Sequence, residues 1–184
     1  LMWTYYHPIN EHEDFDVYYE DLLGARWLAP LSPLVGLYLA HLYVVRNANV
    51  VHIPFSGGPL GRTKLWGFEA WFYRLAGVRT VVIPYGADIY MYSRIVDPMV
   101  RQGLLQSYPD AARKESDIER RVHYWVRNAD VIVMPFTMDG MGRWDVPSVN
   151  MVCIDTKTWS RTQRESERPA DGPVRILHAP NHRG

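Results

Sequence analysis

A turn that follows an apolar run carries the residues of this chain best suited to chemistry. The segment IPYGADIY, residues 83–90, places Tyr85, Gly86 and Asp88 directly after a run of β-branched residues. In open parallel sheets ligands bind beyond the carboxyl ends of the strands, so this is where a site is expected. Asp88 can accept a hydrogen bond from a substrate hydroxyl or act as a base. The alternative is structural, with Asp88 capping the next helix and Gly86 forming the turn.

A second turn is rich in glycine. The segment PFSGGPLGRTK, residues 54–64, places Gly57, Gly58 and Gly61 between a predicted strand and a predicted helix. Such loops let a backbone approach a ligand, and a helix N-terminus favours anions. No lysine directly follows the last glycine, so the segment is not a P-loop, and the spacing G-G-x-x-G is a poor dinucleotide fingerprint. A tight turn without a ligand explains the glycines equally well.

Metal and thiol chemistry have weaker support. Residues 7–21 contain His7, His12 and many carboxylates, which are suitable metal ligands by type. Their spacing matches no helical pair of ligands, and a solvated acidic loop is the favoured interpretation. Cys153, the single cysteine, lies in an apolar run, where structural burial is favoured over nucleophilic catalysis. We expect no metal and no cofactor.

Five aromatic residues lie in the predicted helix at 63–76. Trp66 and Tyr73 are seven residues apart on one helical face, which core packing explains. Phe68, Trp71 and Phe72 decorate the rest of the helix. They pack in the core or against another domain, which is the favoured interpretation, or they contact a membrane or a sugar.

The charge balance and apolar patterning limit the class of protein. Of the 184 residues, twenty are basic and twenty acidic, so no overall field recruits nucleic acid, and we expect no nucleic-acid partner. The longest apolar stretch, residues 22–45, is interrupted by Arg26, Pro30, Pro33 and His41, which favours a buried helix over a membrane span. The first residues lack the pattern of a secretory signal, and a single cysteine fits a cytoplasmic setting.

Two repeated phrases indicate the elements that position these turns. RNANVVHIPF at 46–55 and RNADVIVMPF at 127–136 each place a basic residue and an asparagine before a short apolar run. Such runs predict strands buried on both faces, as in a parallel sheet. Similar runs occur at 78–86, 150–155 and 174–180.

Capping signals predict helices between these strands. Gly77 closes the second helix, and Glu119 completes a capping box with Ser116 at the start of the third. The alternation of strands and helices predicts an α/β fold with a doubly wound, Rossmann-like parallel sheet. The predicted helices span residues 32–46, 63–76 and 116–128.

The C-terminal part predicts a domain boundary. Residues 155–173, DTKTWSRTQRESERPADGP, are polar and without apolar period, which indicates a linker. A new strand follows it. We therefore predict one domain over residues 1–168, with its start missing, and a linker plus the first strand of a truncated second domain over 169–184.

The order of these segments resembles a known family. IPYGADI, RRVHYWVRNADVIVMPF, MVCIDTKTW and VRILHAPNHRG occur in the order typical of GT-B glycosyltransferases, in particular the retaining family 4. The resemblance covers roughly residues 46–184. It implies one half of a GT-B architecture, in which this N-terminal domain serves the acceptor and a C-terminal domain grips the nucleotide-sugar. The chain would then be the acceptor half of an enzyme, cut after the hinge and inactive alone.

The resemblance also implies an activity and its partners. The whole enzyme would be a hexosyltransferase that moves a sugar from a nucleotide-diphosphate-sugar to a hydroxyl, with retention of anomeric configuration. The acceptor would be a polysaccharide or a lipid-linked glycan, which implies peripheral contact with the inner face of the cell membrane. The partners are the nucleotide-sugar, the glycan acceptor and the missing C-terminal domain.

Site residues follow from the resemblance position by position. Gly86 and Asp88 match the family's H-G-x-D turn, with Tyr85 in place of the usual histidine. Arg183 matches the basic residue that helps neutralise the donor diphosphate, and Gly184 follows it. Asp88 is thus the expected catalytic residue, with Tyr85, Gly86, Gly57 and Gly58 on the acceptor side.

The chain also departs from the family. Its paired-glutamate segment, E-x7-E, is absent. The glycine-rich loop expected after the first strand of the N-terminal domain is not evident. A stand-alone binding or interaction module with a transferase-derived fold is the alternative, with the aromatic residues of 66–73 as its surface. An NAD-type oxidoreductase ranks below both because the glycine spacing is wrong.

Overall fold

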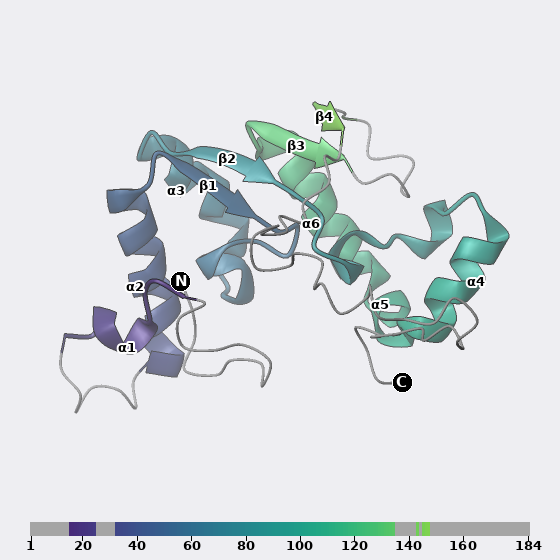
Figure 1. Cartoon of the computed structure of the whole chain (residues 1–184), viewed down its shortest axis with the longest axis horizontal. Coiled ribbons are helices and arrows are strands. Elements are labelled where there is room, and N and C mark those ends of the chain that lie inside the picture. The colour runs from purple at the N-terminus through teal and green to yellow at the C-terminus, as the bar shows by residue number, and fades with distance from the viewer. Residues whose placement is uncertain (1–14, 25–31, 135–142, 144, 148–184) are drawn as a thin grey trace, which may run out of the picture. The chain divides into compact units, whose positions relative to one another are not determined.

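The structure, a computed structural model, describes residues 15–24, 32–134, 143 and 145–147 (Figure 1). By internal contacts the chain divides into Leu1–Val149 and Asn150–Gly184, and all described residues belong to the first unit. The sequence predictions outside the described residues are the strands at 150–155 and 174–180, the domain boundary at 168–169, and the roles of His7, His12, Cys153, Arg183 and Gly184.

A parallel sheet forms the centre of the described part. Its strands lie in the order β1 (Val50–Ile53), β2 (Arg79–Val82), β3 (Val131–Met134) and β4 (Val146–Pro147), and each neighbouring pair is parallel (Figure 1). The strands predicted within 46–55, 78–86 and 127–136 are therefore confirmed. The two-residue strand β4 was not predicted. Helices separate β1 from β2 and β2 from β3, so the mixed helix-and-strand class agrees with the expected α/β fold.

One face of the sheet packs into the main core. The register pairs Val51 with Thr80, and it pairs Val82 with both Ile53 and Ile132, so these five side chains share a face. All five are buried. The alternate residues of β1 are not: Val50 is 57 % exposed. The prediction that the strands are buried on both faces is thus wrong for β1. The residues that share the core with this face include Tyr73, Val122 and Trp125.

Six α-helices and four 3-10 helices accompany the sheet within the described residues. The helix predicted at 32–46 is confirmed as α2, and no described helix is long and apolar enough to cross a membrane. The α-helices are α1 (Tyr19–Leu22), α2 (Ser32–Asn47), α3 (Glu69–Leu75), α4 (Pro98–Ser107), α5 (Pro109–Arg113) and α6 (Glu115–Asn128). The 3-10 helices are η3 (Pro59–Arg62), η4 (Trp66–Phe68), η5 (Ala87–Ile89) and η6 (Tyr92–Arg94).

The repeated Arg-Asn pair ends two helices in the same way. Helix α2 ends at Asn47 and α6 ends at Asn128. The side-chain Nδ2 of Asn47 donates to the carbonyl of Tyr43 at 2.8 Å, and that of Asn128 donates to the carbonyl of Tyr124 at 2.7 Å. Each asparagine side chain therefore adds a hydrogen bond to a carbonyl near the carboxyl end of its helix. The chain then extends directly into a strand.

The second predicted helix begins later than expected. Residues 63–76 form η4 and then α3, which starts at Glu69 and is followed by Gly77 at φ 72°. Trp66 and Tyr73 thus do not share one helix. Tyr73 is buried on α3, whereas Trp66 packs edge-on against Tyr124 of α6, with ring centroids 5.3 Å apart.

The capping box predicted for the third helix is wrong. Helix α6 starts at Glu115, and no side chain caps it. Glu119 instead accepts a hydrogen bond from Arg94 at 2.6 Å, because a long-range partner is available to it. Helix α4 was missed, although Asp97 caps it by accepting from the backbone N–H of Met99 at 2.8 Å.

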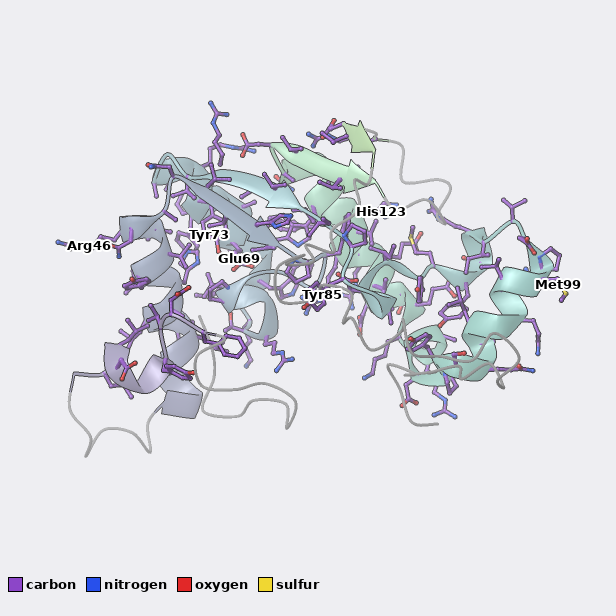
Figure 2. All side chains as sticks on the ribbon, viewed as in Figure 1. Arg46, Glu69, Tyr73, Tyr85, Met99 and His123 are labelled. Carbon is purple, nitrogen blue, oxygen red and sulfur yellow. The ribbon has the colours of Figure 1, made fainter. Side chains whose placement is uncertain are left out.

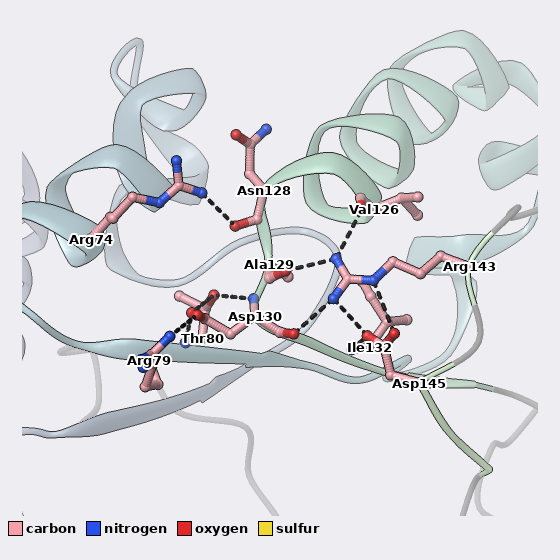
Figure 3. A network of polar contacts seen from close by, with 10 residues as sticks. All are labelled: Arg74, Arg79, Thr80, Val126, Asn128, Ala129, Asp130, Ile132, Arg143 and Asp145. Carbon is pink, nitrogen blue, oxygen red and sulfur yellow. Dashed lines mark hydrogen bonds and ion pairs between the residues drawn. The ribbon is translucent and has the colours of Figure 1, made fainter.

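A polar network fixes the amino ends of the strands (Figure 3). Asp130, just before β3, accepts from the backbone N–H and the hydroxyl of Thr80 at the start of β2. Arg143 donates to the carbonyls of Val126 and Ala129 at the end of α6, at 3.0 and 2.7 Å. It also pairs with Asp145, at 2.7 Å between Nη2 and Oδ2. The network is structural, because it lies at the end of the sheet opposite the two candidate turns.

The same network lowers two carboxyl pKa values. For Asp145 the hydrogen bond from Arg143 is the main cause of a lowered pKa. For Asp130 burial acts to raise the pKa, but the hydrogen bonds from Thr80 and Arg79 outweigh it and the pKa is lowered. Both groups therefore stabilise the fold while they are ionised, and that stabilisation is lost only as the pH falls below their ordinary value of 3.8.

Candidate functional site

Asp88 ties together the loops that follow β1 and β2. Its Oδ2 accepts the backbone N–H of Phe55 at 2.8 Å, and its Oδ1 accepts that of Tyr85 at 3.0 Å. Gly86, at φ 136°, is the residue that precedes η5, and Asp88 lies within η5. Asp88 is therefore not the cap that the structural alternative predicted. The carboxylate holds two loops, 33 residues apart in sequence, at the carboxyl edge of the sheet.

The glycine-rich loop after β1 binds a carboxylate of the chain itself. Glu69, at the start of α3, is fully buried. It accepts the backbone N–H of Gly58 at 3.1 Å, that of Leu60 at 2.9 Å, and the hydroxyl of Tyr73 at 3.3 Å. The loop thus has the anion preference that its glycines suggested, but Glu69 satisfies it. This favours a turn that is closed without a ligand.

Close approach explains the glycines of this loop. A Cβ atom on Gly58 would lie 2.8 Å from Glu69 Oε1 and 2.8 Å from the Tyr73 hydroxyl, and one on Gly61 would lie 2.4 Å from the Ser56 carbonyl oxygen. Gly57 has φ 97°, a conformation that L side chains rarely adopt. The three glycines are therefore required by packing inside the chain.

A buried histidine lies beside Glu69. His41 of α2 stacks at 4.9 Å between ring centroids on Tyr73, and its Nδ1 is 3.9 Å from Glu69 Oε1, which is too long for a hydrogen bond. Neither ring nitrogen of His41 has a hydrogen-bond partner among the described residues. Figure 2 shows Glu69 and Tyr73 close together.

Burial shifts the two pKa values in opposite directions. It raises the pKa of Glu69 to about 7, against the opposing effects of the Leu60, Gly58 and Tyr73 hydrogen bonds and of the nearby Arg121 charge. It lowers the pKa of His41 to about 4. In both cases burial in the folded chain disfavours the charged form.

These shifts predict that two pH dependences cancel. Between pH 4.5 and about 7 only the folded chain holds the Glu69 proton, so stability falls as the pH rises, by about 3 kcal/mol in total. Between about pH 4 and 6.5 only the unfolded chain holds the His41 proton, so stability rises with pH by about 3 kcal/mol. The two groups together should leave stability nearly flat from pH 4.5 to 6.5.

The variant Glu69→Gln should expose the contribution of His41. Its free energy of unfolding, measured by urea titration, should rise by about 2 kcal/mol from pH 4.5 to 6.5, relative to the change in the unmodified chain. An equally flat profile in both proteins would show that His41 is not buried in its neutral form.

Arg121 of α6 anchors the loop after β1 from another side. Its Nη1 donates to the carbonyl oxygens of Ser56 at 2.6 Å and Gly61 at 2.8 Å. The guanidinium carbon lies 4.9 Å from the centre of the Trp66 ring, within the range of a cation–π contact. Burial lowers the pKa of Arg121, while Asp117 and Glu69 act to raise it.

Two cavities border these loops. One, of about 430 Å³, lies beyond β1 and β2 and is lined by Ser56, Ala87, Asp88, Asp110, Lys114, Asp117, Ile118 and Arg121. The other, of about 860 Å³, runs along β1, and its lining includes His52, Ser56, Gly57, Gly58 and Tyr73.

The predicted site residues do not all line the same cavity. Asp88 lines the smaller cavity, and Gly57 and Gly58 line the larger one. The Tyr85 side chain is 84 % exposed. Neither Tyr85 nor Gly86 lines either of these two cavities. The structure therefore brings the two turns together through Asp88, but it does not gather Asp88 and the four acceptor-side residues in one cavity.

Sequence reasoning missed Glu69 and Arg121. Glu69 is a single carboxylate among aromatic residues in WGFEAWFYR, and Arg121 lies four positions before the buried Trp125 in α6. A charge within an apolar helix face is the one signal that marks them. In the part of the chain that the structure describes, no group of three or more His, Cys, Asp or Glu side chains could hold a metal ion.

Comparison with known proteins adds no assignment: no protein family, curated protein or solved structure matches the chain. Function is therefore inferred from the sheet, from the adjoining cavity and from the two hydrogen bonds by which Asp88 joins the loops at Phe55 and Tyr85, called here the Asp88 bridge.

Proposed function

We propose that this chain is the acceptor side of a nucleotide-sugar-dependent glycosyltransferase with a doubly wound, Rossmann-like domain. The observation that carries the proposal is the Asp88 bridge. It joins two loops at the carboxyl edge of a parallel sheet, beside a cavity of about 430 Å³. That edge is where open α/β sheets bind ligands, and Asp88 belongs to the segment that resembles the transferase turn.

The proposal assigns a role to each side of the enzyme. Asp88 positions the two loops and, in the same cavity, can accept a hydrogen bond from an acceptor hydroxyl. By the same resemblance, Arg183 and Gly184 are assigned to binding of the donor diphosphate, where an arginine stabilises the charge of the leaving group. No cofactor is needed, because the nucleotide-sugar is itself the substrate.

The test is a transfer assay on the intact product of the gene. Labelled nucleotide-diphosphate-hexoses are offered one by one with a membrane and polysaccharide extract of the source cells. We expect one donor to label a glycan with retention of configuration, determined by NMR of the product. Lack of transfer from every donor, by a folded protein that also fails to bind nucleoside diphosphates, would refute the proposal.

A binding module is the second candidate, and one observation favours it. Phe68, Trp71 and Leu75 are spaced as one helical stripe and are 57, 52 and 66 % exposed. Apolar stripes of this kind mark contact surfaces when they are contiguous. Failure of the transfer assay, together with concentration-dependent association in sedimentation that is lost in Trp71→Ser, would favour this candidate.

A further inference from the structure

We propose that the cavity of about 430 Å³ beside Asp88 binds an oxyanion, a phosphate or a carboxylate, carried by the acceptor. The inference rests on the proposed function for the identity of the ligand, but the binding of an anion can be tested without it.

The three carboxylates of the wall have partners. Asp88 accepts two backbone N–H groups. Asp110 pairs with Arg113 at 2.9 Å, and Asp117 pairs with Arg120. Each negative charge is therefore already stabilised by a hydrogen-bond donor of the chain.

The two cations of the wall have unused donors. Lys114 makes no side-chain hydrogen bond or ion pair within the described residues. Arg121 uses only Nη1 for hydrogen bonds, to the carbonyl oxygens of Ser56 and Gly61, which fixes the plane of the guanidinium. Its Nε and Nη2 form no hydrogen bond among the described residues. These two groups form one edge of the planar fork, which suits two parallel hydrogen bonds to an oxyanion.

The surroundings favour an anion over a neutral ligand. Arg121 is partly desolvated and stacks on Trp66, so its charge gains more from an anion than an exposed charge would. Asp117 on α6 and Glu69 on α3 both act to raise the pKa of Arg121, but both already accept hydrogen bonds from other groups. Ser56 also lines this cavity, and a serine hydroxyl is a donor of the type that binds oxyanions.

The cavity is lined by three carboxylates and two cations. Together with Arg113 and Arg120, which pair with Asp110 and Asp117 but do not line the cavity, the set has four basic and three acidic side chains. An oxyanion between Lys114 and Arg121 would complete the set of paired charges. The cavity lies within the size range of small-ligand sites, so it also has room for the group that bears the anion.

The test is a titration of the isotope-labelled 184-residue chain with inorganic phosphate, with glucuronate and with chloride. We expect the Nε–H signal of Arg121 to shift and saturate with phosphate or glucuronate but not with chloride. Tighter binding of phosphate indicates a phosphorylated acceptor, and tighter binding of glucuronate indicates an acidic sugar. Shifts that are equal for all three anions, or absent, would overturn the inference.

Two variants make the result specific. Lys114→Gln removes a cation that has no structural contact, and it should weaken binding about tenfold, the loss expected for one charge-assisted hydrogen bond. Arg127→Gln removes an exposed cation of α6, the helix that Lys114 precedes; Arg127 does not line the cavity, and its loss should leave binding unchanged. Equal weakening by both variants would show a non-specific charge effect and would overturn the inference.

The two proposals can fail separately. An intact protein that transfers sugar but binds neither anion at Arg121 would refute the anion site and leave the transferase proposal in place. If the chain binds phosphate in this cavity but the intact protein transfers no sugar, the anion site stands and the result counts against the transferase proposal.

Discussion

Glu69→Ala is expected to lower the free energy of unfolding by about 3–5 kcal/mol, measured by urea titration at pH 7. The substitution removes the acceptor of two backbone N–H groups, those of Gly58 and Leu60, and of the Tyr73 hydroxyl. The hydrogen bonds from the Leu60 N–H and the Tyr73 hydroxyl are buried and that from Gly58 is partly buried, so at least two donors would lose their acceptor out of reach of bulk solvent. Unpaired buried donors cost more than the hydrogen bonds themselves contribute.

Burial of the carboxylate does not reverse this expectation. Ionised Glu69 is costly at high pH, as its raised pKa shows, and an apolar residue would remove that cost. However, its main partners are backbone groups, which no substitution at position 69 can remove. A buried charge can be exchanged for an apolar residue without loss only when its partners are exchanged too.

Glu119→Ala is the matched control. Glu119 lies on a helix and pairs with Arg94, but its side chain is 40 % exposed, so the loss should stay below about 1 kcal/mol. Similar losses in both variants would show that Glu69 does not hold the loop after β1.

Asp88→Ala is expected to lower stability by about 2–3 kcal/mol and to increase amide hydrogen exchange at Phe55 and Tyr85. Both amides donate to the Asp88 carboxylate, and hydrogen bonds to charged groups are stronger than those to neutral ones. Under the proposed function, the loops would also lose their relative position. We then expect sugar transfer to fall about a hundredfold in kcat, the effect of misplacing a site by roughly 1 Å.

Asp110→Ala is the control for this second variant. Asp110 lines the same cavity, but its pair with Arg113 is almost fully exposed, so stability and exchange at Phe55 should not change measurably. Rapid exchange at Phe55 in the unmodified chain would contradict the Asp88 bridge. A fall in kcat with unchanged exchange at Phe55 and Tyr85 would instead point to direct contact between Asp88 and the substrate.

Local patterns were sufficient for much of the secondary structure. The apolar runs located β1, β2 and β3, and the Arg-Asn pairs located the ends of α2 and α6, because these features depend on residues a few positions apart. The same reasoning failed where a distant partner competes. Glu119 bonds Arg94, 25 residues away, instead of capping its own helix.

The candidate site depended more strongly on the tertiary structure. Sequence reasoning placed Asp88 and the glycine loop at strand ends, but it could not show that Asp88 bonds Phe55 or that Glu69 satisfies the loop. Arg121 contacts Ser56 across 65 positions of sequence. Contacts of this kind follow from how the elements pack, and composition and periodicity do not record them.

The sequence by itself determined the positions of three parallel strands and the glycines that the turns require. Only the tertiary structure decided which charges are satisfied and which remain available. Burial and long-range hydrogen bonds set those properties, and both arise when residues that are distant in the chain are packed together.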